Sequence, residues 1–343
     1  MTRLHVVDTT MRDGANSFSH QFTTDQVSAI AAGLDRAGVK LIEVTHGDGL
    51  GGSSLQLGRA AHSDAEYITA AVQAVEEARI AVLYVPGIAT LKDLAVAKEC
   101  GAQAVRIAVH CTEADCAEQA VRWAREQGLE VLCFLMMSHM ISPEALAEQA
   151  ALLDGYGAHV VYTVDSAGAL TPSGAAARVA AMRARVSCEV GFHAHNNLGC
   201  AVGNTLAAID AGATYVDGSL RGLGASAGNA ATEVLVAALQ RDGHETGINL
   251  FDLVDVAEDI VAPIMPRPQV IDATALTIGY AGVYGTFFLF AKRAAEKYGV
   301  DSREILLELG RRGVIGGQED MIIDVAAELA GKADLPAGAG VRG

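Results

Sequence analysis

The chain of 343 residues has no apolar run long enough to cross a membrane, and its first residues, MTRLHVVDTT, lack the apolar stretch of a signal peptide. It has no block rich in Lys and Arg, and acidic residues outnumber basic ones, 41 against 25, for a formal charge of −16. No two of its six cysteines have CxxC spacing. These absences predict a cytoplasmic protein with reduced cysteines that spans no membrane and binds no nucleic acid.

Short runs rich in Val, Ile and Leu recur along the chain, separated by Ala-rich segments with helical periodicity. The eight strand candidates are 4–10, 40–46, 80–85, 104–110, 130–137, 159–166, 188–195 and 215–220. Continuous apolar strands that alternate with amphipathic helices indicate parallel strands covered by helices. Eight such units predict a closed (β/α)8 TIM barrel, with a doubly wound open sheet as the alternative.

The alternation of strands and helices stops after about residue 245, and the later segments read as helices alone. We therefore expect three parts. They are a (β/α)8 barrel catalytic domain at 1–245, a helical C-terminal domain at 246–330 and a disordered tail at 331–343.

Polar residues gather where the expected strands end, which is the face on which barrel enzymes build their sites. They are Asp8, Arg12, Asp13, His46, His110, Asp165, Ser166, His193 and His195. The histidines of FHAHNN are two apart, so on a strand both face the same side and could bind one ion. A lone histidine is more often structural, but this pair with a carboxylate from the adjacent first strand predicts a metal site with open positions for a substrate.

Several motifs now suggest a known family. In chain order they are TTMRDG, EVTHGDGLGGSS, HCTEAD, FLMMSHM, VDSAGAL, GFHAHNNLG, GASAGNA, GYAGVY and GGQEDM, within residues 4–328. The chain resembles the 4-hydroxy-2-oxovalerate aldolase family, class II pyruvate aldolases of the DRE-type TIM-barrel metallolyase superfamily. The resemblance implies a carbon–carbon lyase of aromatic hydrocarbon catabolism that acts on 2-oxoacids and aldehydes. It also implies a divalent ion, usually Mn²⁺ with Mg²⁺ or Co²⁺ as alternatives. Finally, it implies an acylating aldehyde dehydrogenase that contacts the helical domain, and this dehydrogenase receives the aldehyde through a tunnel.

The resemblance also implies roles for individual residues. The metal ligands of the family correspond to Asp13, His193 and His195, and His193 is expected beside the substrate as well. Arg12 matches the arginine that stabilises the pyruvate enolate, although by itself it could equally be a structural ion-pair partner of Asp8 or Glu43. A residue that holds the pyruvate carboxylate corresponds to Ser166, and a tyrosine that orients the acceptor corresponds to Tyr284.

Two positions depart from the family pattern. Where the family has a histidine as general base, three residues after the metal-binding aspartate, this chain has Asn16, whose carboxamide cannot take a proton. Deprotonation of the substrate would then fall to His20, to hydroxide at the metal or to a group on the substrate. At Val85 the family commonly has a leucine that lines the aldehyde pocket, so a bulkier aldehyde is expected here.

Three functions therefore compete. The first is a metal-dependent aldolase that cleaves 4-hydroxy-2-oxoacids to pyruvate or 2-oxobutyrate and an aldehyde, or forms them from these compounds. Asn16 suggests a biosynthetic variant of this enzyme. The second is an acyl-CoA-using synthase or lyase of the same superfamily. The third is a non-catalytic barrel that only binds and stabilises a dehydrogenase.

Overall fold

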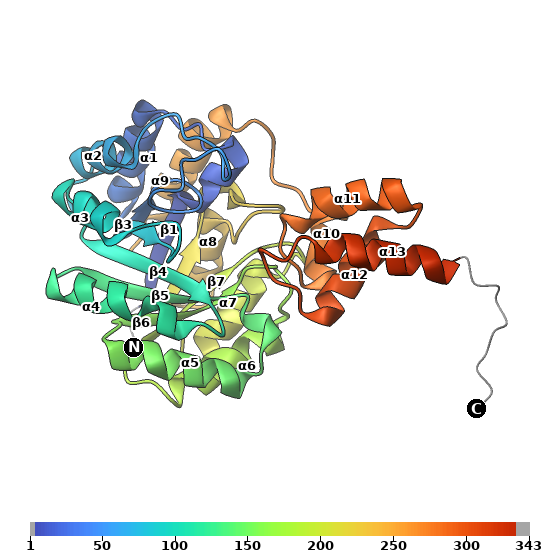
Figure 1. Ribbon diagram of the computed structural model, residues 1–343. Helices are drawn as coiled ribbons and strands as arrows, with labels where there is room; N and C mark the ends of the chain where they lie inside the picture. The colour runs from blue at the N-terminus through green and yellow to red at the C-terminus, as the bar shows by residue number, and fades with distance from the viewer. Residues whose placement is uncertain (1–3, 334–343) are drawn as a thin grey trace.

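A computed structural model describes residues 4–333 of the chain. Eight parallel strands form a closed barrel in which neighbours in sequence pair and β8 pairs with β1 (Figure 1). The prediction of a (β/α)8 TIM barrel is confirmed, and closure of the sheet rules out the open-sheet alternative. The strands are β1 (His5–Met11), β2 (Leu41–Val44), β3 (Arg79–Tyr84), β4 (Ala104–His110), β5 (Glu130–Met136), β6 (Val160–Asp165), β7 (Glu189–Ala194) and β8 (Tyr215–Gly218).

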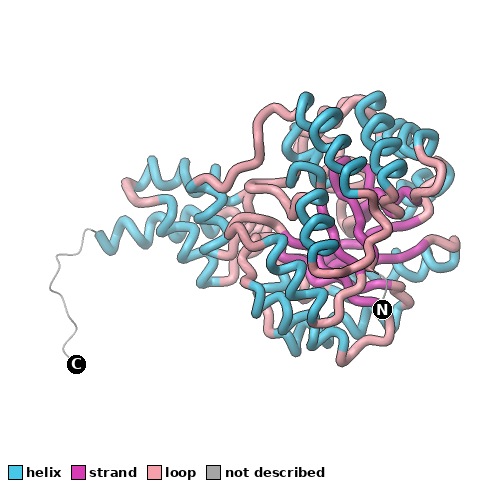
Figure 2. Tube along the Cα trace, turned by 180° about the vertical axis from the view of Figure 1, so that it is seen from behind, coloured by secondary structure: helices cyan, strands magenta, loops and turns pink. Residues whose placement is uncertain are grey.

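A ring of helices covers the outside of the barrel (Figure 2). Local sequence signals fix several of their ends: Thr23 and Gln26 form a capping box at the start of α1. Gly38, with φ of 97°, ends the same helix in a left-handed conformation that only glycine adopts without strain. The helices are α1 (Thr24–Ala37), α2 (Asp64–Ala74), α3 (Leu91–Glu99), α4 (Glu118–Glu126), α5 (Pro143–Tyr156), α6 (Pro172–Arg183), α7 (Ala201–Asp210) and α8 (Thr232–Arg241).

Both faces of the strands are buried, which explains their continuous apolar sequences. On β4, Val105, Ile107 and Val109 face outward and belong to the core beneath the helices. Ala104 and Ala108 face inward and belong to the core inside the barrel. The inward row therefore also includes the position between these two alanines, where the residue is a fully buried arginine.

The C-terminal part contains only helices among the described residues (Figure 1). The helix α9 (Leu250–Asp255) packs against α1 of the barrel, whereas the four helices that follow pack against one another. These four are α10 (Ala273–Ala281), α11 (Phe287–Tyr298), α12 (Ser302–Arg312) and α13 (Met321–Ala333). Of the expected tail, residues 331–333 belong to α13, and 334–343 lie outside the described residues.

These four helices form a layer at the end of the barrel at which the strands finish (Figure 1). The imidazole Nε2 of His139, just after β5, lies 3.0 Å from the carbonyl oxygen of Gly282, just after α10. Between residues 4 and 333, no helix is both long and apolar enough to span a bilayer. All six cysteines are free.

Candidate active site at the carboxyl end of the barrel

Two strands bring one carboxylate and two imidazoles together. Asp13 begins the short helix η1 (Asp13–Phe18) directly after β1, His193 lies on β7, and His195 follows the same strand. Their potential ligand atoms all lie within 4.8 Å of one another. The Nε2 atoms of His193 and His195 are 3.4 Å and 3.3 Å from the Oδ2 atom of Asp13. The expected same-face orientation of the two histidines is thus what the structure has.

The ionised state of Asp13 suits metal binding. Burial raises the pKa of Asp13, but Arg12 and the two histidines outweigh it and hold that pKa well below its ordinary value. The Nδ1 atom of His193 lies 2.8 Å from the Oδ2 atom of Asp217, an arrangement that fixes the ring and turns Nε2 towards Asp13. One carboxylate oxygen and two imidazole nitrogens are a donor set that divalent first-row metals accept, with further positions left for a substrate.

Arg12 lies beside this group and is tied to two carboxylates. Its Nε donates to Glu43 Oε2 at 2.8 Å, and its Nη1 lies 3.3 Å from Asp13 Oδ2. The ion pair with Glu43 is therefore present, while the side chain remains 12% exposed towards the mouth of the barrel. These contacts leave Nη2 available for an oxygen of a substrate.

Asp8 was grouped with the site residues, but the structure places it elsewhere. It lies within β1 rather than after it, and its carboxylate accepts hydrogen bonds from the Thr10 amide and from the Thr232 hydroxyl of α8. Side chains alternate along a strand, so this aspartate faces the outer helix while its neighbours face the barrel interior.

Asn16 lies in η1, three residues after Asp13. Its carboxamide nitrogen donates to the Asp13 carbonyl oxygen at 3.0 Å and lies 3.4 Å from the Asp13 carboxylate oxygen Oδ1. At this position, where the resemblance leads us to expect a base, the structure therefore has a neutral donor to the carboxylate of the candidate metal group.

A second histidine group lies nearby, formed by His20, His46 and Asp48. The two imidazole rings stack with centroids 3.7 Å apart. In His46, Nδ1 accepts the Asp48 amide at 3.1 Å and Nε2 lies 3.0 Å from the Gly58 carbonyl oxygen, so both nitrogens are in use.

His20 is also held by the backbone. Its Nδ1 accepts the Gly47 amide at 3.3 Å, and burial together with the neighbouring His46 lowers its pKa to about 4. The imidazole is therefore neutral and already accepts a hydrogen bond.

The remaining predicted residues follow β6, β3 and α10. Ser166 follows β6, and its Oγ accepts the Met137 amide at 3.0 Å, which leaves the hydroxyl proton free to donate. Val85 follows β3 and packs against the core inside the barrel. Tyr284 follows α10; burial, with Cys111 and Glu113 nearby, raises its pKa to about 12.

Sequence reasoning missed two buried charged residues beneath the site, Arg106 and Asp217. Both interrupt apolar strands, in AVRIAVH and YVDG, and charged side chains are almost never fully buried unless paired. Glu43 had been considered only as a partner of Arg12, and the structure shows that it also pairs with Arg106.

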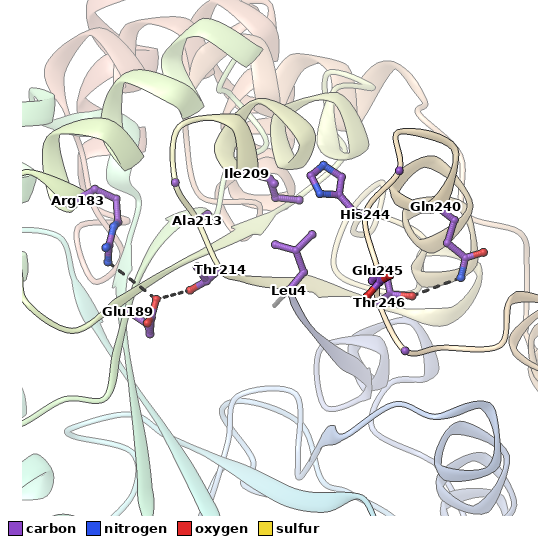
Figure 3. Close-up of a pocket in the computed structure, with 13 residues that line it drawn as sticks. Leu4, Arg183, Glu189, Ile209, Ala213, Thr214, Gln240, His244, Glu245 and Thr246 are labelled. Carbon is purple, nitrogen blue, oxygen red and sulfur yellow. Dashed lines mark hydrogen bonds and ion pairs between the residues drawn. The ribbon is translucent and has the colours of Figure 1, made fainter. Parts of the chain in front are cut away.

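A wide cleft lies at the opposite end of the barrel, where the strands begin. It has a volume of about 1200 Å³, and Figure 3 shows Leu4, Glu189 and His244 among its lining residues. None of the predicted site residues lines it.

Comparison with known proteins agrees with this geometry. Residues 3–260 match the HMGL-like family, and residues 269–331 match the DmpG-like communication domain. The carboxyl transferase domain of Rhizobium etli pyruvate carboxylase has a similar fold, with a TM-score of 0.76 and 16% identity over 97% of this chain and 61% of that one. Fold and site thus define an HMGL-like barrel with a metal-binding donor set.

Closer relatives specify the family. The 4-hydroxy-2-oxovalerate aldolase 2 of Nocardia farcinica is 65% identical over 98% of this chain and 97% of its own length. The 4-hydroxy-2-oxovalerate aldolase of Carboxydothermus hydrogenoformans is 58% identical over 95% of this chain and 97% of its own. The chain belongs to the 4-hydroxy-2-oxovalerate aldolase family, so the predictions of that family and of a carbon–carbon lyase are confirmed. Class II aldolases of this kind imply a divalent metal, which the donors of Asp13, His193 and His195 fit.

Proposed function

We propose that the protein is a divalent-metal-dependent aldolase that cleaves or forms 4-hydroxy-2-oxoacids, with pyruvate or 2-oxobutyrate as the oxoacid. The observation that carries the proposal is the meeting of Asp13, His193 and His195 beside Arg12 at the mouth of the barrel. The names of the 65% and 58% identical relatives supply the substrate class.

In the cleavage direction, a base removes the proton of the C4 hydroxyl, the C3–C4 bond breaks and an aldehyde leaves. The electron pair of that bond moves onto the oxoacid and gives an enolate with negative charge on the C2 oxygen. Arg12 is held by Glu43 and Asp13 in a position from which its free Nη2 can donate to that oxygen. Ser166, whose hydroxyl proton is free, is our candidate donor to the carboxylate of the oxoacid.

Asp13, His193 and His195 are the residues that would hold the metal, with Mn²⁺ as our first choice and Mg²⁺ or Co²⁺ as alternatives. When bound, the ion would act as a Lewis acid towards the 2-oxo group. The chain itself supplies the ionised carboxylate, the two oriented imidazoles and, through Asp217, the fixed tautomer of His193.

Asn16 is the basis for a more specific proposal. Because its carboxamide cannot exchange a proton with the C4 oxygen in either direction, we infer slow cleavage of 4-hydroxy-2-oxovalerate. A role in the condensation direction of a biosynthetic pathway then requires a different aldehyde. Val85, one methylene smaller than leucine and packed at the inner wall of the barrel, supports an aldehyde bulkier than acetaldehyde. Tyr284 is our candidate for orienting that aldehyde from the side of the helical layer.

An acylating aldehyde dehydrogenase is our proposed partner for the helical layer. The match of residues 269–331 to the DmpG-like communication domain supports it. So does a partly apolar groove of about 530 Å³ between α10 and α12, where Leu276, Tyr280 and Leu307 are 51%, 74% and 39% exposed.

One set of assays tests the function. Metal-free protein should be inactive and regain activity with Mn²⁺, and it should combine pyruvate or 2-oxobutyrate with one of a series of aldehydes of increasing size. Activity that needs acetyl-CoA would favour the synthase of the same superfamily. Folded, metal-loaded protein with no turnover in either assay would favour a non-catalytic partner.

The partner is tested by co-purification with an acylating aldehyde dehydrogenase encoded nearby. Tyr280→Asp should weaken the complex, because it places a charge in the apolar groove, while Asp210→Asn on α7 serves as a control far from the helical layer. A complex that forms equally well with Tyr280→Asp would remove the groove from the interface.

A further inference from the structure

The middle of the barrel contains an unusual set of inward side chains, which we call the buried ionic layer. Its members come from the four even-numbered strands and are Glu43 of β2, Arg106 of β4, Tyr162 of β6 and Asp217 of β8. Each is at most 2% exposed. In (β/α)8 barrels such a layer is dominated by branched apolar side chains. Here it carries a guanidinium and two carboxylates.

Arg106 lies at the centre of the buried ionic layer. Its Nη1 donates to Glu43 Oε2 at 2.6 Å, and its Nη2 donates to Asp217 Oδ2. The guanidinium carbon lies 4.2 Å from the ring centroid of Phe134. Burial raises the pKa of Asp217, but Arg106 and His193 outweigh it and lower that pKa below its ordinary value. Arg106 therefore pairs with both carboxylates of the layer.

The barrel also makes room for the aromatic member of the layer. A Cβ atom at Gly191 of β7 would lie only 2.5 Å from the Tyr162 ring, so a larger residue there would displace it. The Tyr162 ring lies 5.4 Å from the guanidinium of Arg106. Arg106 is thus flanked by aromatic rings as well as by its two carboxylates, which leaves it little freedom to move.

Both carboxylates also contact residues of the candidate active site. The oxygen of Glu43 that accepts from Arg106 also accepts from Arg12 Nε, at 2.8 Å. The oxygen of Asp217 that accepts from Arg106 also lies 2.8 Å from His193 Nδ1. We propose that Arg106 is a positioning residue that sets, through these shared oxygens, the direction of the Arg12 guanidinium and the orientation of the His193 ring.

The reason lies in the shape of the guanidinium. Its planar fork presents two N–H groups to two carboxylates at once, whereas an ammonium is a compact charge at the end of a flexible stem. If either carboxylate shifts towards or away from Arg106, its shared oxygen also moves relative to Arg12 or His193. The inference rests on the proposed function for the roles of those two residues.

The test uses Arg106→Lys in the full chain. Two quantities are measured: the Kd of Mn²⁺ for the metal-free protein, by electron paramagnetic resonance, and the exchange of the methyl protons of pyruvate in the loaded protein, by NMR. Residues that couple sites through a packed network change the coupling by factors of roughly 2 to 30. We expect Arg106→Lys to raise the Kd of Mn²⁺ and to slow the proton exchange, each by a factor in that range.

Variants of the two carboxylates should separate the two effects. Asp217→Asn should raise the Kd of Mn²⁺ by about 10- to 100-fold, as loss of a partner behind a ligating histidine usually does. Glu43→Gln should slow proton exchange through Arg12 and leave the Kd of Mn²⁺ near that of the wild type. Only Arg106→Lys should change both quantities.

A matched control is Ile107→Ala, next to Arg106 on the same strand, fully buried and facing outward. It should lower the melting temperature and leave both quantities unchanged. If Arg106→Lys behaves in the same way, Arg106 is only structural and the proposal is wrong. Wild-type protein that neither binds Mn²⁺ nor exchanges pyruvate protons would instead refute the proposed function.

If Arg106→Lys does not fold, the double variant with Glu43→Gln and Asp217→Asn tests the proposal instead. Because both carboxylates pair with Arg106, the effect of Asp217→Asn on the Kd of Mn²⁺ should change by more than about twofold when Glu43→Gln is also present, although Glu43→Gln alone leaves that Kd near the wild-type value. Additive effects would overturn the proposal.

Discussion

Two groups of histidines and an aspartate lie at the same end of the barrel, and they differ in what their nitrogens contact. In the group of His193 and His195, both Nε2 atoms face the carboxylate of Asp13. In the group of His20 and His46, backbone amides donate to both Nδ1 atoms, and a carbonyl oxygen lies next to Nε2 of His46. Both groups contain ligand types close to one another, but only in the first do two imidazole Nε2 atoms face a shared carboxylate with no backbone group bonded to them.

Hydrogen-bond partners, rather than residue types, distinguish our proposed metal site from the second cluster. A loop amide that donates to an imidazole nitrogen uses the lone pair that a metal would need. An acidic residue behind the ring does the opposite, since it fixes the proton on the far nitrogen. Asp217 has this second role for His193.

The largest expected effect comes from removing one histidine of the first group. His195→Ala should weaken Mn²⁺ binding by more than the roughly 100-fold that is the upper end for loss of an outer partner, and activity should be lost with it. His46→Ala should cost about 1–3 kcal/mol of stability, because it leaves the Asp48 amide and the Gly58 carbonyl without their partner, yet the folded variant should bind Mn²⁺ normally. Calorimetric titration with Mn²⁺ measures the metal affinity of each variant. Equal losses of Mn²⁺ affinity in the two variants would contradict the difference between the two histidine groups.

A smaller effect is expected at the arginine beside the first group. Arg12→Lys should reduce the rate by about 10² to 10³, the usual cost of losing a preorganised donor to a developing oxyanion. Its Kd for Mn²⁺ should stay close to that of the wild type, because no metal ligand is changed. Arg79→Lys, at the opposite end of the barrel, is the control and should leave the rate within about twofold. An Arg12→Lys enzyme as active as this control would exclude the enolate role.

Much of this site could be predicted from the sequence because its signals are local. Strand periodicity places His193 and His195 on one face, and the closed barrel brings β1 next to β8 and near β7. Asp8 was misplaced because proximity in sequence to Arg12 says nothing about which face of a strand a residue occupies. Arg106 was missed because its partner Asp217 lies 111 residues away, and only closure of the barrel brings the two together.

The roles of Asn16 and His20 depend on contacts that no local pattern shows. Asn16 donates to Asp13 only because η1 turns the chain directly after β1. His20 accepts from Gly47 because the loop after β2 folds over the loop after β1. Loop conformations of this kind are set by tertiary packing, so sequence alone left several candidates open for the base.

The next prediction concerns the position that lacks a base. Asn16→His should raise the rate of 4-hydroxy-2-oxovalerate cleavage by at least about tenfold, part of the 10²–10⁴ that a positioned general base contributes. Exchange of the pyruvate methyl protons should change little, since that step does not require deprotonation of the C4 hydroxyl. Asn16→Ala is the control, because it also removes the hydrogen bonds to Asp13 but adds no base. Wild-type cleavage at a normal family rate, with no gain in Asn16→His, would show that another group already serves as the base.

The smallest effect is expected at His20, the remaining imidazole near Asn16. Its Nδ1 accepts the Gly47 amide and its pKa is about 4, so it is a poorly matched base at neutral pH. His20→Gln keeps an acceptor for that amide and should retain cleavage within about threefold, far from the ~10²–10⁴ loss expected for a base.

The pKa of His20 also predicts a change of stability with pH. The pKa of His20 is about 4 in the folded protein, against an ordinary value of 6.5. Between pH 6.5 and about 4 the unfolded chain therefore binds a proton at His20 that the folded protein does not bind, so the stability falls as the pH falls through this window. Thermal unfolding at pH 7 and at pH 5 should therefore show the wild type losing more stability than His20→Gln. If His20→Gln instead abolishes cleavage and follows the same pH dependence of unfolding as the wild type, His20 is the base and its contacts with the backbone are secondary.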